Sequence, residues 1–309
     1  MTAWFLKLHR WLALLFALPL ALVIGTGLIL SFEPSLVVAN SKPGNLSVQK
    51  IETILARHDP AGKARGVTYR SYDGSLTVGG GRGAAGISVD AATGAARSGG
   101  STMATLFGTS RSLHEHLLFS GSGLTIASTI ALLVIAVIGV LMGWPRFANS
   151  VSGWHKGTAW VALPLLILSP LTGLAMAFGI TFAGPPQAAA APVTLVEAVR
   201  TLGKSNDLSG LIWLRERRGQ MLARIVENGE YRLYAIDSAG VRPLQRNWPR
   251  LLHEGNWMGH VSAAVNVVTS AAMIVLLVTG FWIWARKQLR RRRNIALRTA
   301  TSSVAHAPG

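Results

Sequence analysis

Four long apolar segments constrain this chain more than any other feature of its sequence. Each can cross the ~30 Å hydrocarbon core of a bilayer as a helix, which takes about 20 residues. Only 14% of the 309 residues are charged, against roughly 25% in soluble proteins. The sequence therefore predicts an integral membrane protein, mainly α-helical, with a four-transmembrane-helix bundle. The predicted spans are Trp11–Leu30, Leu124–Met142, Ala159–Phe178 and Val261–Trp284.

The basic residues predict the orientation of these helices. The formal net charge is +17, and Lys and Arg gather on the cytoplasmic side of membrane helices. Lys7 and Arg10 precede the first span, and the run Arg290–Arg293 follows the fourth. Both termini are therefore predicted to be cytoplasmic. The positive charge is then explained by topology and by affinity for membrane lipid, so nucleic acid is not a predicted partner.

The two long segments between the spans are predicted to be exported, each as a small α+β module. In the first, Val48–His58 has helical spacing and Gly66–Arg70 reads as a strand. In the second, a helix over Leu195–Leu202 precedes a strand over Leu211–Leu214. The predicted architecture is a tandem repeat of helix, exported module and helix. Its parts are transmembrane helix 1 (1–33), module 1 (34–110), transmembrane helix 2 with its preceding histidine segment (111–147), transmembrane helix 3 (148–180), module 2 (181–250), transmembrane helix 4 (251–288) and a basic, disordered cytoplasmic tail (289–309).

Histidines recur at matched positions of the two halves. His9 is followed after 17 residues by Thr26-Gly27, and His155 after 17 residues by Thr172-Gly173. The step to each glycine is 18 residues, about five helical turns at 3.6 residues per turn. Gly27 and Gly173 either leave room for a bulky flat group such as haem or serve close packing between helices. The spacing does not separate these two interpretations.

A second pair of matched histidines precedes the second helix of each half, in Leu113-His114-Glu115 and Leu252-His253-Glu254. The predicted topology puts His9 and His155 at the cytoplasmic edge and His114 and His253 at the exported edge. Neutral imidazole suits an apolar bundle, and haem iron can be held by two axial histidines. Because the chain has no cysteine, thiolate ligation and covalent attachment through C-x-x-C-H are excluded. These positions predict two b-type haems that carry electrons across the bilayer, with no acid–base or nucleophilic catalytic group.

Alternatives remain at the exported edge. His116 lies two residues after His114, and His260 lies seven after His253, so either could replace its neighbour as a ligand. A transition-metal site is the competing interpretation, because imidazole also suits zinc and copper. Glu115 and Glu254, each beside an exported-edge histidine, would then complete it.

The order of these motifs resembles the PepSY-associated transmembrane family. The resemblance covers nearly the whole chain except the tail. It rests on two motif groups near the first and third spans and two near the second and fourth. These are His9-Arg10-Trp11 with Thr26-Gly27-Leu28, Trp154-His155-Lys156-Gly157 with Leu171-Thr172-Gly173, Leu113-His114 with Leu117-Leu118, and Leu252-His253-Glu254-Gly255 with Thr279-Gly280 and Trp284-Ala285-Arg286. Val89-Asp90-Ala91-Ala92-Thr93-Gly94 and, more weakly, Ala235-Ile236-Asp237-Ser238-Ala239-Gly240 resemble PepSY domains.

The resemblance implies a multi-pass protein of the bacterial inner membrane that reduces ferric iron in a siderophore or a similar chelate on the periplasmic side. Carried over residue by residue, it implies His9, His114, His155 and His253 as axial ligands of two b-type haems. Two alternatives stay open: a haem-free membrane anchor whose PepSY modules bind or inhibit other proteins, and a haem subunit of a separate periplasmic reductase. The sequence contains no nicotinamide- or flavin-binding fingerprint, so the electron donor is another protein, a quinol or a reduced cofactor.

Overall fold

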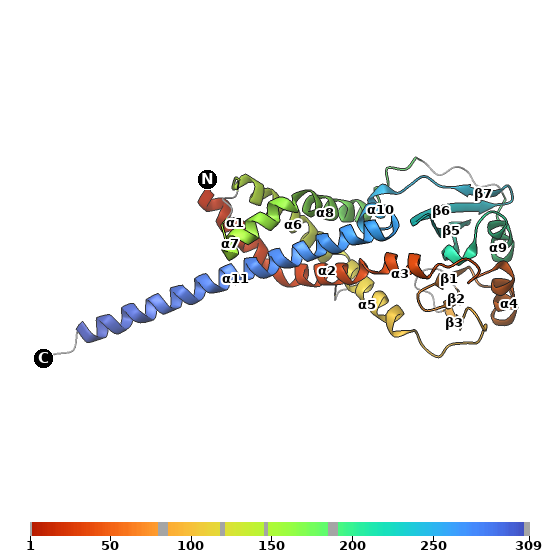
Figure 1. Ribbon diagram of the computed structural model, residues 1–309, viewed down its shortest axis with the longest axis horizontal. Coiled ribbons are helices and arrows are strands. Elements are labelled where there is room, and N and C mark those ends of the chain that lie inside the picture. Colours follow the sequence, from red (N-terminus) through yellow and green to blue (C-terminus); the bar gives the residue numbers. More distant parts are fainter. Residues whose placement is uncertain (1, 80–85, 118–120, 145–147, 185–190, 306–309) are drawn as a thin grey trace.

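The computed structural model describes residues 2–79, 86–117, 121–144, 148–184 and 191–305, with only the backbone described for Thr2 and 296–305. The molecule is elongated, with a bundle of helices at one side and a β-sheet at the other (Figure 1). We call the side of the bundle that meets the sheet the sheet end, and the opposite side the far end. The bundle contains α1 (Thr2–Leu15), α2 (Ala17–Leu30), α3 (Glu33–Asn40), α5 (Thr102–His116), α6 (Gly123–Leu141), α7 (Val151–Val161), α8 (Leu163–Ala177), α10 (Trp248–Glu254) and α11 (Gly259–Ala305).

The sheet has seven strands, all antiparallel, in the order β3-β2-β1-β4-β5-β6-β7. Two helices, α4 (Val48–His58) and α9 (Leu195–Gly203), pack on it, and a short 3-10 turn, Leu208–Gly210, precedes β4. α9 starts with a capping box, in which the side chains of Thr194 and Glu197 each accept a hydrogen bond from the other residue's backbone N–H. The strands are β1 (Gly66–Arg70), β2 (Ser75–Gly79), β3 (Gly86–Asp90), β4 (Leu211–Arg217), β5 (Gln220–Glu227), β6 (Glu230–Asp237) and β7 (Gly240–Pro243).

The two predicted modules are one structural unit, so their separation in the predicted fold class is wrong. β1 pairs with β4, with Gly66 opposite Arg215 and Val67 opposite Leu214. One hydrophobic core joins both helices to both halves of the sheet. In two isolated modules, β1 and β4 would each be an exposed edge strand with unpaired backbone groups. Their pairing removes both edges. A junction between strands so far apart in sequence leaves no local pattern, which explains why the prediction missed it.

The prediction of a bundle of four transmembrane helices is also wrong. In the part of the chain that the structure describes, three helical segments are long and apolar enough to cross a membrane: Ala17–Asn40, Gly123–Leu141 and Gly259–Ile295. A fourth crossing exists only if α7 and α8 are counted as one, and these are bent by 61° at their junction. Pro164 stands in the first turn of α8, where its missing N–H and its ring prevent a straight continuation from α7. The observed fold is therefore a bundle with a broken segment attached to one seven-stranded sheet.

The C-terminal segment differs from its prediction as well. The sequence favours a disordered tail over 289–309, whereas α11 continues as a helix to Ala305. Residues 285–305 contain many good helix formers, among them Lys, Gln, Leu, Ala and Arg, and no Gly or Pro. Figure 1 shows this helix extending alone past the ends of α1 and α7.

Candidate functional site

Three histidines of the bundle are held in one common arrangement, which we call a socket, and His9 is held in a reduced form of it. A complete socket consists of three residues of a neighbouring helix: one whose backbone carbonyl contacts the ring, a threonine three residues later, and a glycine directly after the threonine. His114 of α5 and His253 of α10 occupy sockets on α2 and α8, and His155 of α7 occupies one on α11. The sequence contains the pattern as Thr26-Gly27, Thr172-Gly173 and Thr279-Gly280.

The two sockets near the sheet end match closely. His114 Nδ1 lies 2.9 Å from the carbonyl oxygen of Val23 and 3.2 Å from Thr26 Oγ1. His253 Nδ1 lies 3.0 Å from the carbonyl oxygen of Ser169 and 3.3 Å from Thr172 Oγ1. Both rings are therefore fixed by two oxygens of one helical turn.

The far end holds one complete and one reduced socket. His155 Nδ1 lies 2.9 Å from Thr279 Oγ1, and the ring also bonds the backbone of Leu276. His9 Nδ1 lies 3.2 Å from the carbonyl oxygen of Ile135. Three residues after Ile135 the chain has Ile138 instead of threonine, so this socket lacks the hydroxyl.

These partners determine which ring nitrogen carries the proton. A carbonyl oxygen only accepts, so Nδ1 must donate to it. The threonine hydroxyls give their own protons to their helices, Thr26 to Leu22 at 2.7 Å and Thr172 to Leu168 at 2.8 Å. Nδ1 is therefore protonated, and the lone pair lies on Nε2. Among the described residues, none is hydrogen-bonded to Nε2 of any of the four rings. Histidines that ligate metals are usually oriented in this way.

The glycines of the sockets make room for imidazole rings. A Cβ at Gly27 would lie 3.2 Å from Cε1 of His114, and one at Gly173 would lie 2.9 Å from Cε1 of His253. A Cβ at Gly280 would lie 3.3 Å from Cε1 of His155. In contrast, a Cβ at Gly139 would have no atom within 4 Å. Gly27 and Gly173 therefore contact histidine rings, whereas the sequence suggested either space for a haem or close packing between helices. Each glycine admits the histidine of another helix.

The histidines come together in two pairs. The rings of His114 and His253 have centroids 6.0 Å apart, near the sheet end. His9 and His155 are close enough to interact electrostatically, and they belong to α1 and α7 at the far end (Figure 1). The pairing predicted from the repeat is therefore the arrangement in the structure, whereas the ligand role of each residue remains a prediction.

The four other histidines lie outside this arrangement. His116 and His260, the alternatives at the exported edge, are exposed, whereas His114 and His253 are half-buried. His58 bonds the carbonyl of Gly94 in the sheet unit through Nε2, at 2.8 Å. His306 lies outside the described residues.

Charged residues link the sheet to the histidine pair at the sheet end. Burial alone would raise the pKa of Glu254, but Arg224 and Arg250 outweigh it and hold that pKa at about 2. Arg224 and Arg250 lie 2.6 and 3.1 Å from this carboxylate, and Asn256 donates to it at 2.8 Å. Arg111, one turn before His114, pairs with Glu33. The carboxylate of Glu254 is thus engaged by cations of the chain, which argues against its role as a metal ligand.

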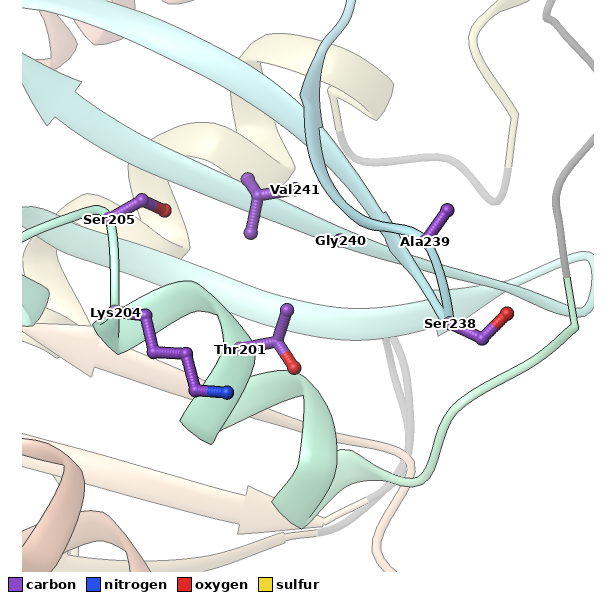
Figure 2. Close-up of a pocket in the computed structure, with 7 residues that line it drawn as sticks. All are labelled: Thr201, Lys204, Ser205, Ser238, Ala239, Gly240 and Val241. Atoms are coloured by element: carbon purple, nitrogen blue, oxygen red, sulfur yellow. The ribbon is translucent and has the colours of Figure 1, made fainter.

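Other arrangements that could hold a ligand are weaker. Within the described part of the chain, no group of three or more His, Asp or Glu residues is placed to hold a metal ion. A shallow depression lies between the end of α9 and the turn from β6 to β7, lined by Thr201, Lys204, Ser205 and residues 238–241 (Figure 2). It belongs to the sheet, and none of the paired histidines lines it.

The long apolar helices and the sheet attached to one side of them define a membrane-spanning protein. The chain belongs to a known family of such proteins, because the family model described as PepSY-associated TM region matches residues 6–287. No curated protein matches the chain.

Proposed function

We propose that this protein conducts electrons across a membrane through two b-type haems and delivers them to ferric iron in a siderophore or similar chelate. The observation that carries the proposal is the set of sockets, because they leave four Nε2 lone pairs in two pairs inside the bundle. His114 and His253 would hold one haem and His9 and His155 the other. Haem iron, when bound, accepts and passes on one electron at a time.

The residues fit haem better than a metal ion bound by protein side chains alone. A zinc site takes three or four protein ligands, whereas haem iron needs only axial ligands from the protein. The rings of His114 and His253 come from two different helices, their centroids lie 6.0 Å apart, and they would hold the group between them.

The residues around each pair fix the imidazoles rather than react. The carbonyl oxygens of Val23 and Ser169, with Thr26 and Thr172 beside them, accept the Nδ1 protons, which fixes the tautomer of both rings and leaves their Nε2 atoms free. In the orientation we propose, the far end faces the bacterial cytoplasm, since Lys7, Arg10 and Lys156 lie there, and the sheet lies in the periplasm. Reduction of Fe(III) to Fe(II) would weaken its binding to the hard oxygen ligands of a chelator and release it.

Transport of electrons through the bilayer can be tested in closed vesicles that contain the protein. The vesicles enclose a ferric hydroxamate chelate and a chromogenic chelator specific for Fe(II), and dithionite is added outside. We expect Fe(II) to appear inside at least tenfold faster than in protein-free vesicles. The variant His9→Ala should reduce the rate to that of protein-free vesicles. A wild-type rate equal to that of protein-free vesicles would contradict the proposal, whichever way the protein is inserted.

A further inference from the structure

Acidic and basic residues are separated along the molecule. All 13 Asp and Glu residues lie within 33–115 or 197–254, the segments that form the sheet and the sheet end of the bundle. Of the 30 Lys and Arg residues, 11 lie outside these segments. Arg146 is one of them and lies outside the described residues. The other ten belong to the far end: Lys7, Arg10, Lys156, Arg286, Lys287, Arg290, Arg291, Arg292, Arg293 and Arg298.

Membrane topology explains only part of this separation. The rule that places positive residues inside counts Lys and Arg, while Asp and Glu contribute little to it. It therefore does not require that the far end lack every carboxylate. Without carboxylates, the positive field of this face is not reduced by internal ion pairs. Among the described residues, none of the cations of 286–293 lies within ion-pair distance of a carboxylate.

The basic residues flank the far-end histidine pair and continue outward from it. Arg10 follows His9 and Lys156 follows His155. α11, which carries the socket of His155, leads from Thr279 to Arg286 over about 10 Å at 1.5 Å per residue. Arg286, Lys287 and Arg290–Arg293 are all exposed. Successive residues are about 100° apart around a helix, so the four arginines surround α11.

We propose that this basic far end, centred on Arg290–Arg293, is the docking face for an acidic one-electron carrier protein that supplies the electrons. This proposal rests on the proposed function and names the class of its donor. One electron would leave the reduced carrier and reach the group between His9 and His155, with no bond broken and no proton transferred. Complementary charge would speed the encounter and orient the carrier.

The shape of α11 favours a protein partner over the lipid surface. About 20 residues of helix cross the hydrocarbon core, so a crossing that starts near Gly259 ends well before Arg290. A helix that lies on a membrane has one apolar face, whereas the arginines of 290–293 point in all directions. These residues therefore project from the membrane, where a water-soluble carrier can reach them.

The test is a binding measurement with the full chain in nanodiscs of uncharged phosphatidylcholine. The probe is an oxidised plant-type [2Fe–2S] ferredoxin, which is acidic, and basic cytochrome c is the comparison protein. We expect the ferredoxin to bind, its Kd to rise at least tenfold between about 50 and 500 mM salt because of screening, and cytochrome c not to bind. The combined variant R290Q/R291Q/R292Q/R293Q should weaken ferredoxin binding at least tenfold.

A matched variant controls for total charge. K63Q/K204Q/R217Q/R218Q removes four exposed cations from the sheet side of the molecule and should change the Kd less than twofold. Absence of ferredoxin binding, or an equal loss in this variant, would overturn the proposal. The proposal would also be overturned if the arginine variant weakened binding to phosphatidylglycerol vesicles but left ferredoxin binding unchanged. Because binding is measured without electron transfer, a haem-free preparation that binds ferredoxin would overturn the proposed function and leave the docking face standing.

Discussion

Replacing His253 with alanine is expected to lower the haem content from two to one per chain. The Nε2 lone pair of His253 is aimed by Ser169 and Thr172, and alanine removes the ligand while leaving the socket empty. His114→Ala should have the same effect, and each variant should keep the haem held by His9 and His155. Haem is measured per protein after extraction, and the remaining spectrum identifies the surviving site.

Two neighbouring histidines provide matched controls for this prediction. His116→Ala and His260→Ala change exposed residues of the same two regions and should leave two haems. Loss of haem in a control but not in His253→Ala would show that the pairing is wrong. Thr172→Val tests the socket itself, because it removes the hydroxyl near Nδ1 and keeps the shape. It should shift the absorption or the midpoint potential of the haem near the sheet end without removing it.

Replacing Gly66 with valine is expected to destabilise the sheet by about 3 kcal/mol or more, at the upper end of the cost of overpacking. A Cβ at this position would lie 2.6 Å from Cβ of Arg215 and 2.7 Å from the carbonyl oxygen of Leu214. Both are on β4, so valine would force apart the two strands that join the halves of the sheet. Thermal unfolding of the whole protein in detergent should show a markedly lower midpoint.

Gly108→Val is the control for the sheet variant. Gly108 is exposed on α5 and has no atom within 4 Å of its would-be Cβ, so the midpoint should change little. Equal midpoints for Gly66→Val and Gly108→Val would contradict the single seven-stranded sheet. They would agree instead with two independent modules.

Local features of the sequence predicted the elements well, because their signals lie within a few residues. α4 has the bounds that its apolar spacing predicts, Val48–His58, and the capping box marks the start of α9. The junction of β1 with β4 was missed because the paired residues, such as Val67 and Leu214, are far apart in the sequence. Neither strand contains a local pattern that identifies the other as its partner. The bend between α7 and α8 was missed because hydropathy shows how long an apolar segment is, but not whether the helix it forms is straight.

The histidine repeat was visible in sequence, but its physical meaning was only partly predicted. The 18-residue step from His9 to Gly27, about five helical turns, suggested a face shared along one helix. In the structure Thr26 and Gly27 hold His114, while His9 binds α6. The equal spacing therefore reflects the similarity of the two halves of the chain. The contacts that the histidines make are with other helices and not along their own. A threonine and a glycine in adjacent positions, repeated three times in apolar runs, was the available signal for the sockets.

Haem content of the purified wild-type protein tests the central claim most directly. Protein made in haem-replete cells is purified in mild detergent, and its haem is extracted into alkaline pyridine and quantified against protein. The account predicts two equivalents of non-covalent b-type haem and a reduced spectrum typical of two imidazole ligands. A colourless, folded protein from such cells would contradict it.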